Sequence, residues 1–155
     1  MELADILAED SVLTCTGITD KRQLFEVLAQ KAAERTGLTA SEIVDALVAR
    51  EELGSTGLGN GIAIPHGKLK GLDGVVAVFA RLDEPIEFDS VDDQPVDLVM
   101  LLLAPVGAGA DHLKALSRVA RMLRTESVVD QLRGDDDTTR MRAVLTAPLE
   151  TNCAA

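Results

Sequence analysis

VVAVFAR (residues 75–81) and VDLVMLLL (residues 96–103) decide the fold class of this chain. Both runs are almost continuously apolar and rich in Val and Leu, which is typical of strands covered on both faces of a sheet. We therefore expect both runs at the centre of a sheet. Between them, DEP (residues 83–85) predicts a turn, and Ile86 and Phe88 predict a short edge strand.

Amphipathic helical patterns precede and follow these two runs. The first two begin after capping residues, and each ends near a glycine. In chain order, we expect a helix from a cap at Asp20 to a stop at Gly37, a helix from a cap at Thr39 to Leu53 and Gly54, a helix capped by Asp111 that carries Leu113, Leu116, Val119, Ala120 and Leu123 on one face, a short helix over residues 128–132, and a last helix over residues 138–145.

Helices before, between and after buried strands predict an α/β fold: a three-layer domain with a mixed sheet between helices on both faces. The length of 155 residues fits a single domain. We expect that domain over residues 1–148 and a frayed tail over residues 149–155.

Charge and composition exclude several classes of function. The formal net charge of −11 and the 2% of aromatic residues leave neither the basic surface nor the stacking side chains that nucleic-acid binding requires. The longest apolar run, residues 98–105, is too short to cross a bilayer, and the acidic start is unlike a signal peptide. Cys15 and Cys153 show no paired spacing, which suits a reducing compartment. We expect a cytoplasmic protein without membrane insertion.

His66 is the first candidate for a reactive side chain. It follows IAIP (residues 62–65), which predicts a short strand that ends or reaches a sheet edge at Pro65. His66 therefore lies at a strand terminus, where α/β folds place reactive groups, and Gly67 leaves its ring unshielded. The alternative is a structural histidine, which is the commoner case for a lone one.

The loop before this strand resembles an anion site in composition. Residues 54–61 contain repeated glycines, whose backbone N–H groups can converge on an anion, and Ser55 and Thr56 add hydroxyl donors. A tight connection between helix and strand would explain the glycines equally well. Arg50 lies on an otherwise apolar helix stripe; it could serve the same site, or snorkel and cap the helix end.

His112 is the second histidine of the chain. It follows Asp111 in the first turn of the expected helix, where the macrodipole favours a neutral ring and nearby anions. It could steady a phosphoryl group on His66 or lie exposed in a first turn. Arg50, the loop and His66 together offer a transferring phosphoryl group a nucleophile and donors for its oxygens.

REELGSTGLGNGIAIPHGK (residues 50–68) closely resembles the enzyme IIA domains of the bacterial phosphoenolpyruvate-dependent phosphotransferase system, and most of all their nitrogen-regulatory branch, akin to fructose and mannitol IIA domains. The resemblance extends over residues 3–146. It implies a five-stranded mixed sheet and phosphorylation of His66 at Nε2 by an HPr-like phosphocarrier. It further implies that His112 and Arg50 stabilise the phosphoryl group, with Ser55, Thr56, Gly57 and Gly67 beside the phosphate.

The chain would then be a phosphohistidine carrier that regulates partners according to its phosphorylation state; kinases and potassium transport components are targets seen in the family. A fructose-type transport component and a binding module that works without phosphorylation remain alternatives, and a homodimer is possible. A metal-dependent hydrolase finds no HxH or HExxH spacing here, and we expect neither a cofactor nor a metal. Cys15 faintly resembles the phosphocysteine loop of enzyme IIB, although an unreactive buried thiol is the ordinary case.

Overall fold

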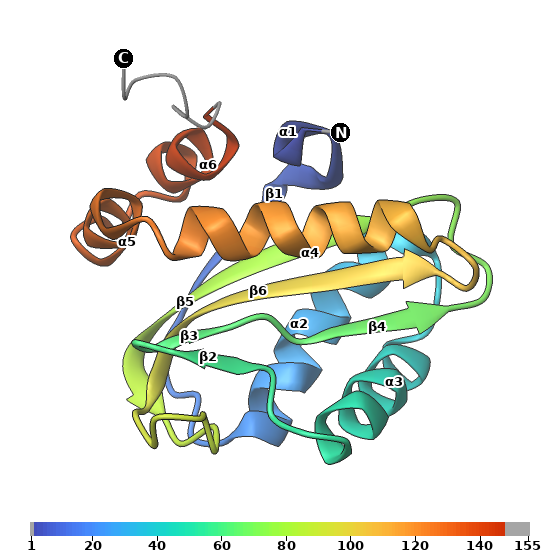
Figure 1. The fold of residues 1–155 in the computed structure, drawn as a ribbon, viewed down its shortest axis with the longest axis horizontal. Helices are drawn as coiled ribbons and strands as arrows, with labels where there is room; N and C mark the ends of the chain where they lie inside the picture. The colour runs from blue at the N-terminus through green and yellow to red at the C-terminus, as the bar shows by residue number, and fades with distance from the viewer. Residues whose placement is uncertain (1, 148–155) are drawn as a thin grey trace.

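A computed structural model describes residues 2–147 of the chain. Strands β5 and β6, which contain all but Val75 of the two apolar runs, form the antiparallel centre of a six-stranded sheet with the order β1-β5-β6-β3-β2, and β4 also pairs with β6 (Figure 1). The elements are α1 (Leu3–Ile6), β1 (Leu7–Cys15), α2 (Lys21–Thr36), α3 (Ala40–Glu52), β2 (Gly57–Gly59), β3 (Ile62–Ala63), β4 (His66–Leu69), β5 (Val76–Ile86), β6 (Val96–Pro105), α4 (Ala110–Leu123), α5 (Glu126–Arg133) and α6 (Thr138–Thr146).

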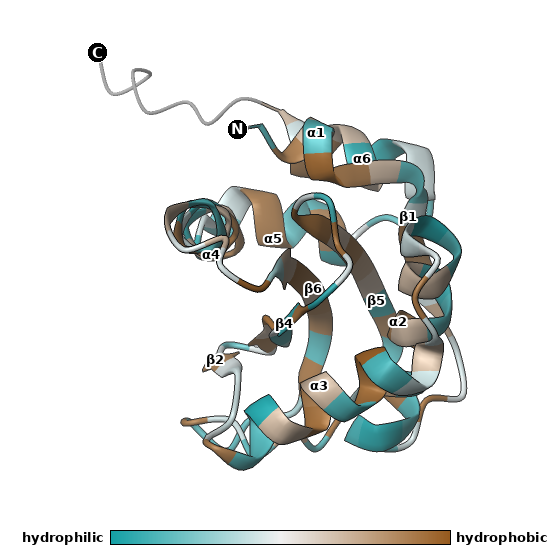
Figure 2. Ribbon diagram, turned by 90° about the vertical axis from the view of Figure 1, so that its right-hand side faces the viewer, coloured by the Kyte–Doolittle hydropathy of each residue, from teal (hydrophilic) through white to brown (hydrophobic). Residues whose placement is uncertain are grey.

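Helices cover both faces of this sheet, so the prediction of a three-layer α/β fold is confirmed. The alternation of side chains along β6 shows why both faces are apolar. Val99, Leu101 and Leu103 join the core beneath α2 and α3. Leu98, Met100 and Leu102 join a second core with residues of α1, α4, α5 and α6. In Figure 2 the apolar strands lie between these two groups of helices.

The sheet is mixed, as predicted, because β5 and β6 are antiparallel while the flanking pairs are mostly parallel. β1 runs parallel to β5, and β3 and β4 run parallel to β6 along its other edge. Two strands share that edge because the pairing with β6 is interrupted after Ala63 and resumes at His66. The backbone N–H of Leu102 donates to the Pro65 carbonyl at 3.0 Å between the two stretches.

The N-terminal elements were not predicted. β1 is an edge strand whose apolar pattern is interrupted by the exposed or half-buried residues Ala8, Glu9 and Asp10. A strand paired on one side needs fewer apolar residues, so its sequence signal is weak. α1 is a single turn and too short for a periodic pattern.

The predicted turn over residues 83–85 and the separate edge strand at Ile86 and Phe88 were wrong. β5 runs through Pro85 to Ile86, which pairs with Val96 after a register irregularity. β1 pairs with β5 only as far as Leu82, so beyond that residue one edge of β5 is unpaired and tolerates a proline without a donor N–H. Phe88 is buried outside the strand.

The helix boundaries largely follow the capping signals. Asp20 and Thr39 cap α2 and α3, and each side chain accepts a hydrogen bond from the backbone three residues on. The third helix begins earlier than expected, because Gly109 is its N-cap and Asp111 lies in its first turn. The predicted loop over residues 54–61 contains the short strand β2, whose pairing with β3 involves two glycines. α5 and α6 were predicted to within two residues.

Two predictions remain open. The single domain over residues 1–148 stays a prediction, and the expected frayed tail at residues 149–155 lies outside the described residues. Within residues 2–147, no helix has the length and apolar character needed to cross a membrane.

Candidate functional site

His66 is the first residue of β4, and it lies opposite Leu102 of the central strand β6. The prediction that a strand ends before Pro65 is confirmed, since β3 ends at Ala63. The strand that begins again at His66 was not predicted. The backbone of His66 is therefore part of the sheet, and its side chain is half-buried.

A backbone hydrogen bond selects the tautomer of His66. Its Nδ1 lies 2.8 Å from the carbonyl oxygen of Ile64, which can only accept. The ring must therefore carry its proton on Nδ1, and the lone pair lies on Nε2. Arg50 Nε donates to that lone pair at 3.2 Å. The free nitrogen of the ring thus faces a cation.

Arg50 joins the histidine to the loop that follows α3. It lies in the last turn of α3, and its Nη1 donates to the carbonyl of Gly54 at 3.0 Å. The side chain therefore caps a carbonyl just beyond the helix end and also reaches His66. That Arg50 stabilises a phosphoryl group stays a prediction.

The fold brings the two histidines together although they are far apart in sequence. The centroids of the His66 and His112 rings are 5.5 Å apart, with 50° between the ring planes. His112 lies in the first turn of α4 and is 6% exposed, so the interpretation as a solvent-exposed residue was wrong. Its buried Nδ1 has no hydrogen-bond partner among the described residues.

The environment keeps both rings neutral near pH 7. Burial lowers the pKa of His66 below its usual 6.5, and Arg50 lowers it further, against the opposing effects of the Ile64 carbonyl and Glu51. Burial also lowers the pKa of His112, as do the nearby His66 and Lys68. A neutral His66 keeps the Nε2 lone pair that a nucleophile needs.

The loop donors expected at the phosphate have other partners in this structure. Ser55 Oγ donates to the Phe88 carbonyl and accepts from the Gly57 N–H, each at 3.1 Å. The backbone N–H and the hydroxyl of Thr56 both donate to Glu51. That Ser55, Thr56 and Gly57 bind phosphate therefore stays a prediction that requires these bonds to exchange.

Gly67 permits a close approach of β4 to α3. A Cβ built on Gly67 would lie 3.4 Å from Cβ of Ala46 in α3. Gly67 is buried against α3. That it lies beside the phosphate stays a prediction.

A profile of the family described as "Phosphoenolpyruvate-dependent sugar phosphotransferase system, EIIA 2" matches residues 5–147. The chain belongs to this family. The "Nitrogen regulatory protein" of Bradyrhizobium diazoefficiens is 49% identical to this EIIA chain over 148 residues, which cover 96% of this chain and 97% of that protein. The "Nitrogen regulatory protein" of Escherichia coli is 35% identical and covers 94% of this chain and 90% of its own length.

Solved structures agree with this assignment. The nitrogen regulatory protein IIA-Ntr from Neisseria meningitidis superposes with a TM-score of 0.88 at 34% identity, covering 93% of this chain and 99% of that one. The mannitol IIA of Escherichia coli, at 22% identity and a TM-score of 0.73 over 89% of this chain and 97% of its own, shares the fold. The resemblance inferred from residues 50–68 is confirmed.

Glu51 is the residue of the EIIA site that the sequence analysis missed. It accepts hydrogen bonds from Thr56 and lies 2.9 Å from Lys21 Nζ, and its side chain is 8% exposed. A signal was present, because a carboxylate in the last turn of a helix opposes the helix dipole and therefore needs a compensating partner.

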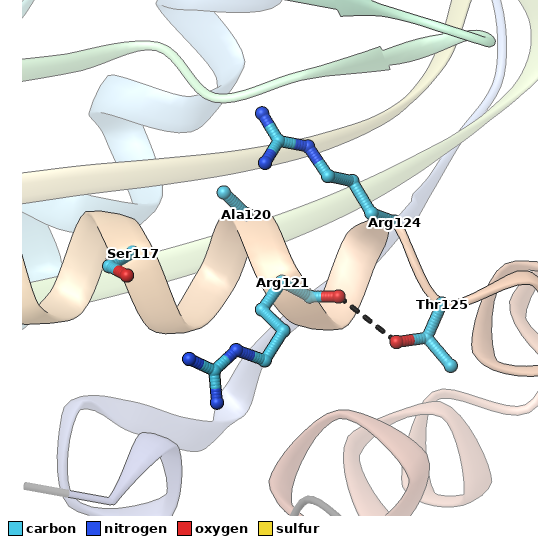
Figure 3. A pocket seen from close by; sticks show the side chains of 5 residues that line it. All are labelled: Ser117, Ala120, Arg121, Arg124 and Thr125. Atoms are coloured by element: carbon cyan, nitrogen blue, oxygen red, sulfur yellow. Dashed lines mark hydrogen bonds between the residues drawn. The ribbon is translucent and has the colours of Figure 1, made fainter. Parts of the chain in front are cut away.

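A hollow on α4 lies apart from the EIIA histidines. It has a volume of about 450 Å³ and is lined by Ser117, Ala120, Arg121, Arg124 and Thr125 (Figure 3). These residues follow His112 by five to thirteen positions, which places them roughly 8–20 Å along the helix from it. Within residues 2–147, no group of three or more His, Cys, Asp or Glu side chains could hold a metal ion.

Proposed function

We propose that this EIIA chain is a phosphohistidine carrier that accepts a phosphoryl group on Nε2 of His66 from an HPr-like phosphocarrier. Its phosphorylation state then regulates cytoplasmic partner proteins, such as kinases or potassium transport components. The observation that carries the proposal is the hydrogen bond between His66 Nδ1 and the Ile64 carbonyl, because it leaves Nε2 as the nucleophilic nitrogen.

The transfer needs no cofactor. The Nε2 lone pair forms a bond to phosphorus, the nitrogen–phosphorus bond of the donor phosphohistidine breaks, and its electron pair returns to the donor ring. The Nδ1 proton stays on His66, where the Ile64 carbonyl stabilises the positive charge that develops on the imidazole.

Arg50 and His112 stabilise the phosphoryl group in this proposal. The Arg50 guanidinium, which contacts Nε2 in the unphosphorylated chain, passes to the phosphoryl oxygens as they arrive. His112 lies close enough, with ring centroids 5.5 Å apart, to donate to the same oxygens. Ser55, Thr56, Gly57 and Gly67 complete the proposed phosphate surroundings.

Incubation with phosphoenolpyruvate, enzyme I and an HPr-like carrier tests the proposal, read out by intact and peptide mass spectrometry. We expect one acid-labile phosphoryl group on the peptide that contains His66. An unlabelled chain, beside a second acceptor that the same donor does label, would favour the alternative of a binding module. Onward transfer to a fructose-type IIB protein would instead favour the transport alternative.

The pH dependence of His66 follows from its lowered pKa. Well above the lowered pKa the ring is neutral and its reactivity does not change with pH; as the pH falls through that pKa, Nε2 takes up a proton and the lone pair is lost. We expect an NMR titration of the His66 Cε1–H resonance to give a midpoint below 6.5. A midpoint at or above pH 6.5 would contradict a neutral nucleophile. The titration is carried out on this chain alone, so the donor's histidine does not contribute to the signal.

His112→Ala is expected to be labelled on His66 but at a rate about 10²-fold lower, as found when one donor to a developing anion is removed. The nucleophile itself remains, so the final stoichiometry is unchanged. A time course of acid-labile label measures the rate, and Ser117→Ala, an exposed position on the same helix, is the control. A rate equal to wild type would show that His112 does not support the transfer.

A further inference from the structure

Glu51 occupies a position that is unfavourable for a carboxylate. It lies in the last turn of α3, where the backbone carbonyls repel negative charge, and its side chain is only 8% exposed. A buried carboxylate in such a place costs free energy unless cations or N–H and O–H donors surround it. The groups that contact the Glu51 carboxylate therefore indicate its structural role.

Three groups compensate this carboxylate. The Thr56 hydroxyl donates to Oε1 at 2.6 Å, and the Thr56 backbone N–H lies 3.1 Å from Oε2. Lys21 Nζ, from α2, donates to Oε2 at 2.9 Å and lies 4.4 Å from the centroid of the Phe88 ring. Hydrogen bonds of this kind, with a charge on the acceptor or on both partners, are about twice as strong as neutral ones.

These contacts close a short turn beside the nucleophile. Glu51 holds Thr56 against the end of α3, so the residues between them form a closed loop that contains Gly54. The Gly54 N–H donates to the Glu51 carbonyl at 3.1 Å, and the Gly54 carbonyl accepts from Arg50 Nη1. Because the loop fixes that carbonyl, it also fixes the guanidinium that donates to His66 Nε2.

We propose that Glu51 is a positioning residue for phosphoryl transfer: it holds the Gly54 carbonyl, and through it the Arg50 guanidinium, at His66. The inference rests on the proposed function, since it assigns Arg50 to the transfer. Lys21 has the supporting part of keeping the carboxylate in place from the neighbouring helix.

Without Glu51, the Thr56 donors lose their partner and the Gly54 carbonyl is no longer held. Arg50 then samples orientations that do not meet the phosphoryl oxygens, and misplacement of about 1 Å can cost 10²-fold in rate. We expect Glu51→Ala to lower the maximal rate of transfer by about 10- to 100-fold and to leave KM for the phosphorylated donor unchanged. Glu51→Gln keeps one amide oxygen for Thr56 and should recover part of the rate.

Glu52 offers a matched control. It is the next residue of the same helix, it has the same charge, and its exposed side chain makes no hydrogen bond or ion pair among residues 2–147. Initial rates of acid-labile labelling at several donor concentrations should therefore distinguish Glu51→Ala and Glu51→Gln from Glu52→Ala and Glu52→Gln. Thermal unfolding of all four variants tests whether they fold; if Glu51→Ala does not, Glu51→Gln is compared with Glu52→Gln.

A double-substitution cycle with Arg50→Ala tests whether Glu51 acts through Arg50. We expect Glu51→Ala to cause no further loss of rate in the Arg50→Ala background. The inference would be overturned if the rate losses of Glu51→Ala and Arg50→Ala multiplied in the double variant, or if the Glu51 variants had the same transfer rates as the Glu52 variants. Labelling of the wild-type chain would still uphold the proposed function in either case. A wild-type chain that takes no label would overturn the proposed function itself.

Discussion

His66→Ala is expected to accept no phosphoryl group, however long it is exposed to phosphorylated donor. The substitution removes the only ring whose Nε2 is freed by a backbone acceptor on Nδ1, within the pair of histidines that the fold brings together. His112 lacks such an acceptor: its buried Nδ1 has no hydrogen-bond partner among the described residues, so no backbone group directs its lone pair to Nε2. We therefore expect label below the detection limit of intact mass spectrometry, and not merely a slower rate.

The loss should not come from unfolding. His66 is half-buried and makes two side-chain hydrogen bonds, so its removal costs on the order of 1–2 kcal/mol of stability. Thermal unfolding of His66→Ala beside wild type measures that cost, and His112→Ala is the control that keeps the nucleophile. Acid-labile label that persists on His66→Ala would show that another residue is the acceptor.

Arg50→Ala is expected to lower the rate of phosphoryl transfer by about 10²- to 10³-fold, the usual effect of removing one donor from a developing anion. The substitution should also raise the pKa of His66, because Arg50 is one of the groups that lower it. The protonated fraction of the nucleophile then grows at any pH near that pKa, and this adds to the loss of rate.

Arg50→Lys separates charge from geometry. A lysine keeps the positive charge, but its single ammonium group cannot reproduce the planar fork that contacts His66 and Gly54 together. We expect it to recover only a minor part of the rate. Arg121→Ala, an exposed arginine on α4, is the control for the loss of one positive charge. Labelling kinetics of Arg50→Ala that equal this control would exclude Arg50 from the transfer.

The centre of the fold could be predicted because its signals are local and strong. The apolar runs of β5 and β6 allow few environments other than a sheet covered on both faces. Asp20 and Thr39 mark the starts of helices because their side chains accept hydrogen bonds from the first turn, and Gly37 marks a helix end because it adopts a positive φ. β1 and the continuation of β5 through Pro85 depend on which edges lack a neighbouring strand. Strand order is a tertiary property that no short window of sequence contains.

At the site, too, local features could be predicted from the sequence and long-range contacts could not. His66, Arg50 and the glycine-rich loop lie within one stretch of sequence, so their association could be predicted from residue chemistry and from the family resemblance. The partner of the Ser55 hydroxyl could not, because the Phe88 carbonyl reaches it across 33 positions of the chain. The partner of the Thr56 hydroxyl is Glu51, whose place in the last turn of α3 is the signal that the sequence analysis missed. The hydroxyls looked free for an anion only because those partners were not visible.

The acceptor that fixes the tautomer of His66 is a main-chain oxygen two residues earlier, that of Ile64. A main-chain acceptor is present whatever side chain is encoded at that codon, so no ordinary point mutation deletes it. The ring nitrogen that carries the lone pair is therefore the same whatever side chain stands at position 64.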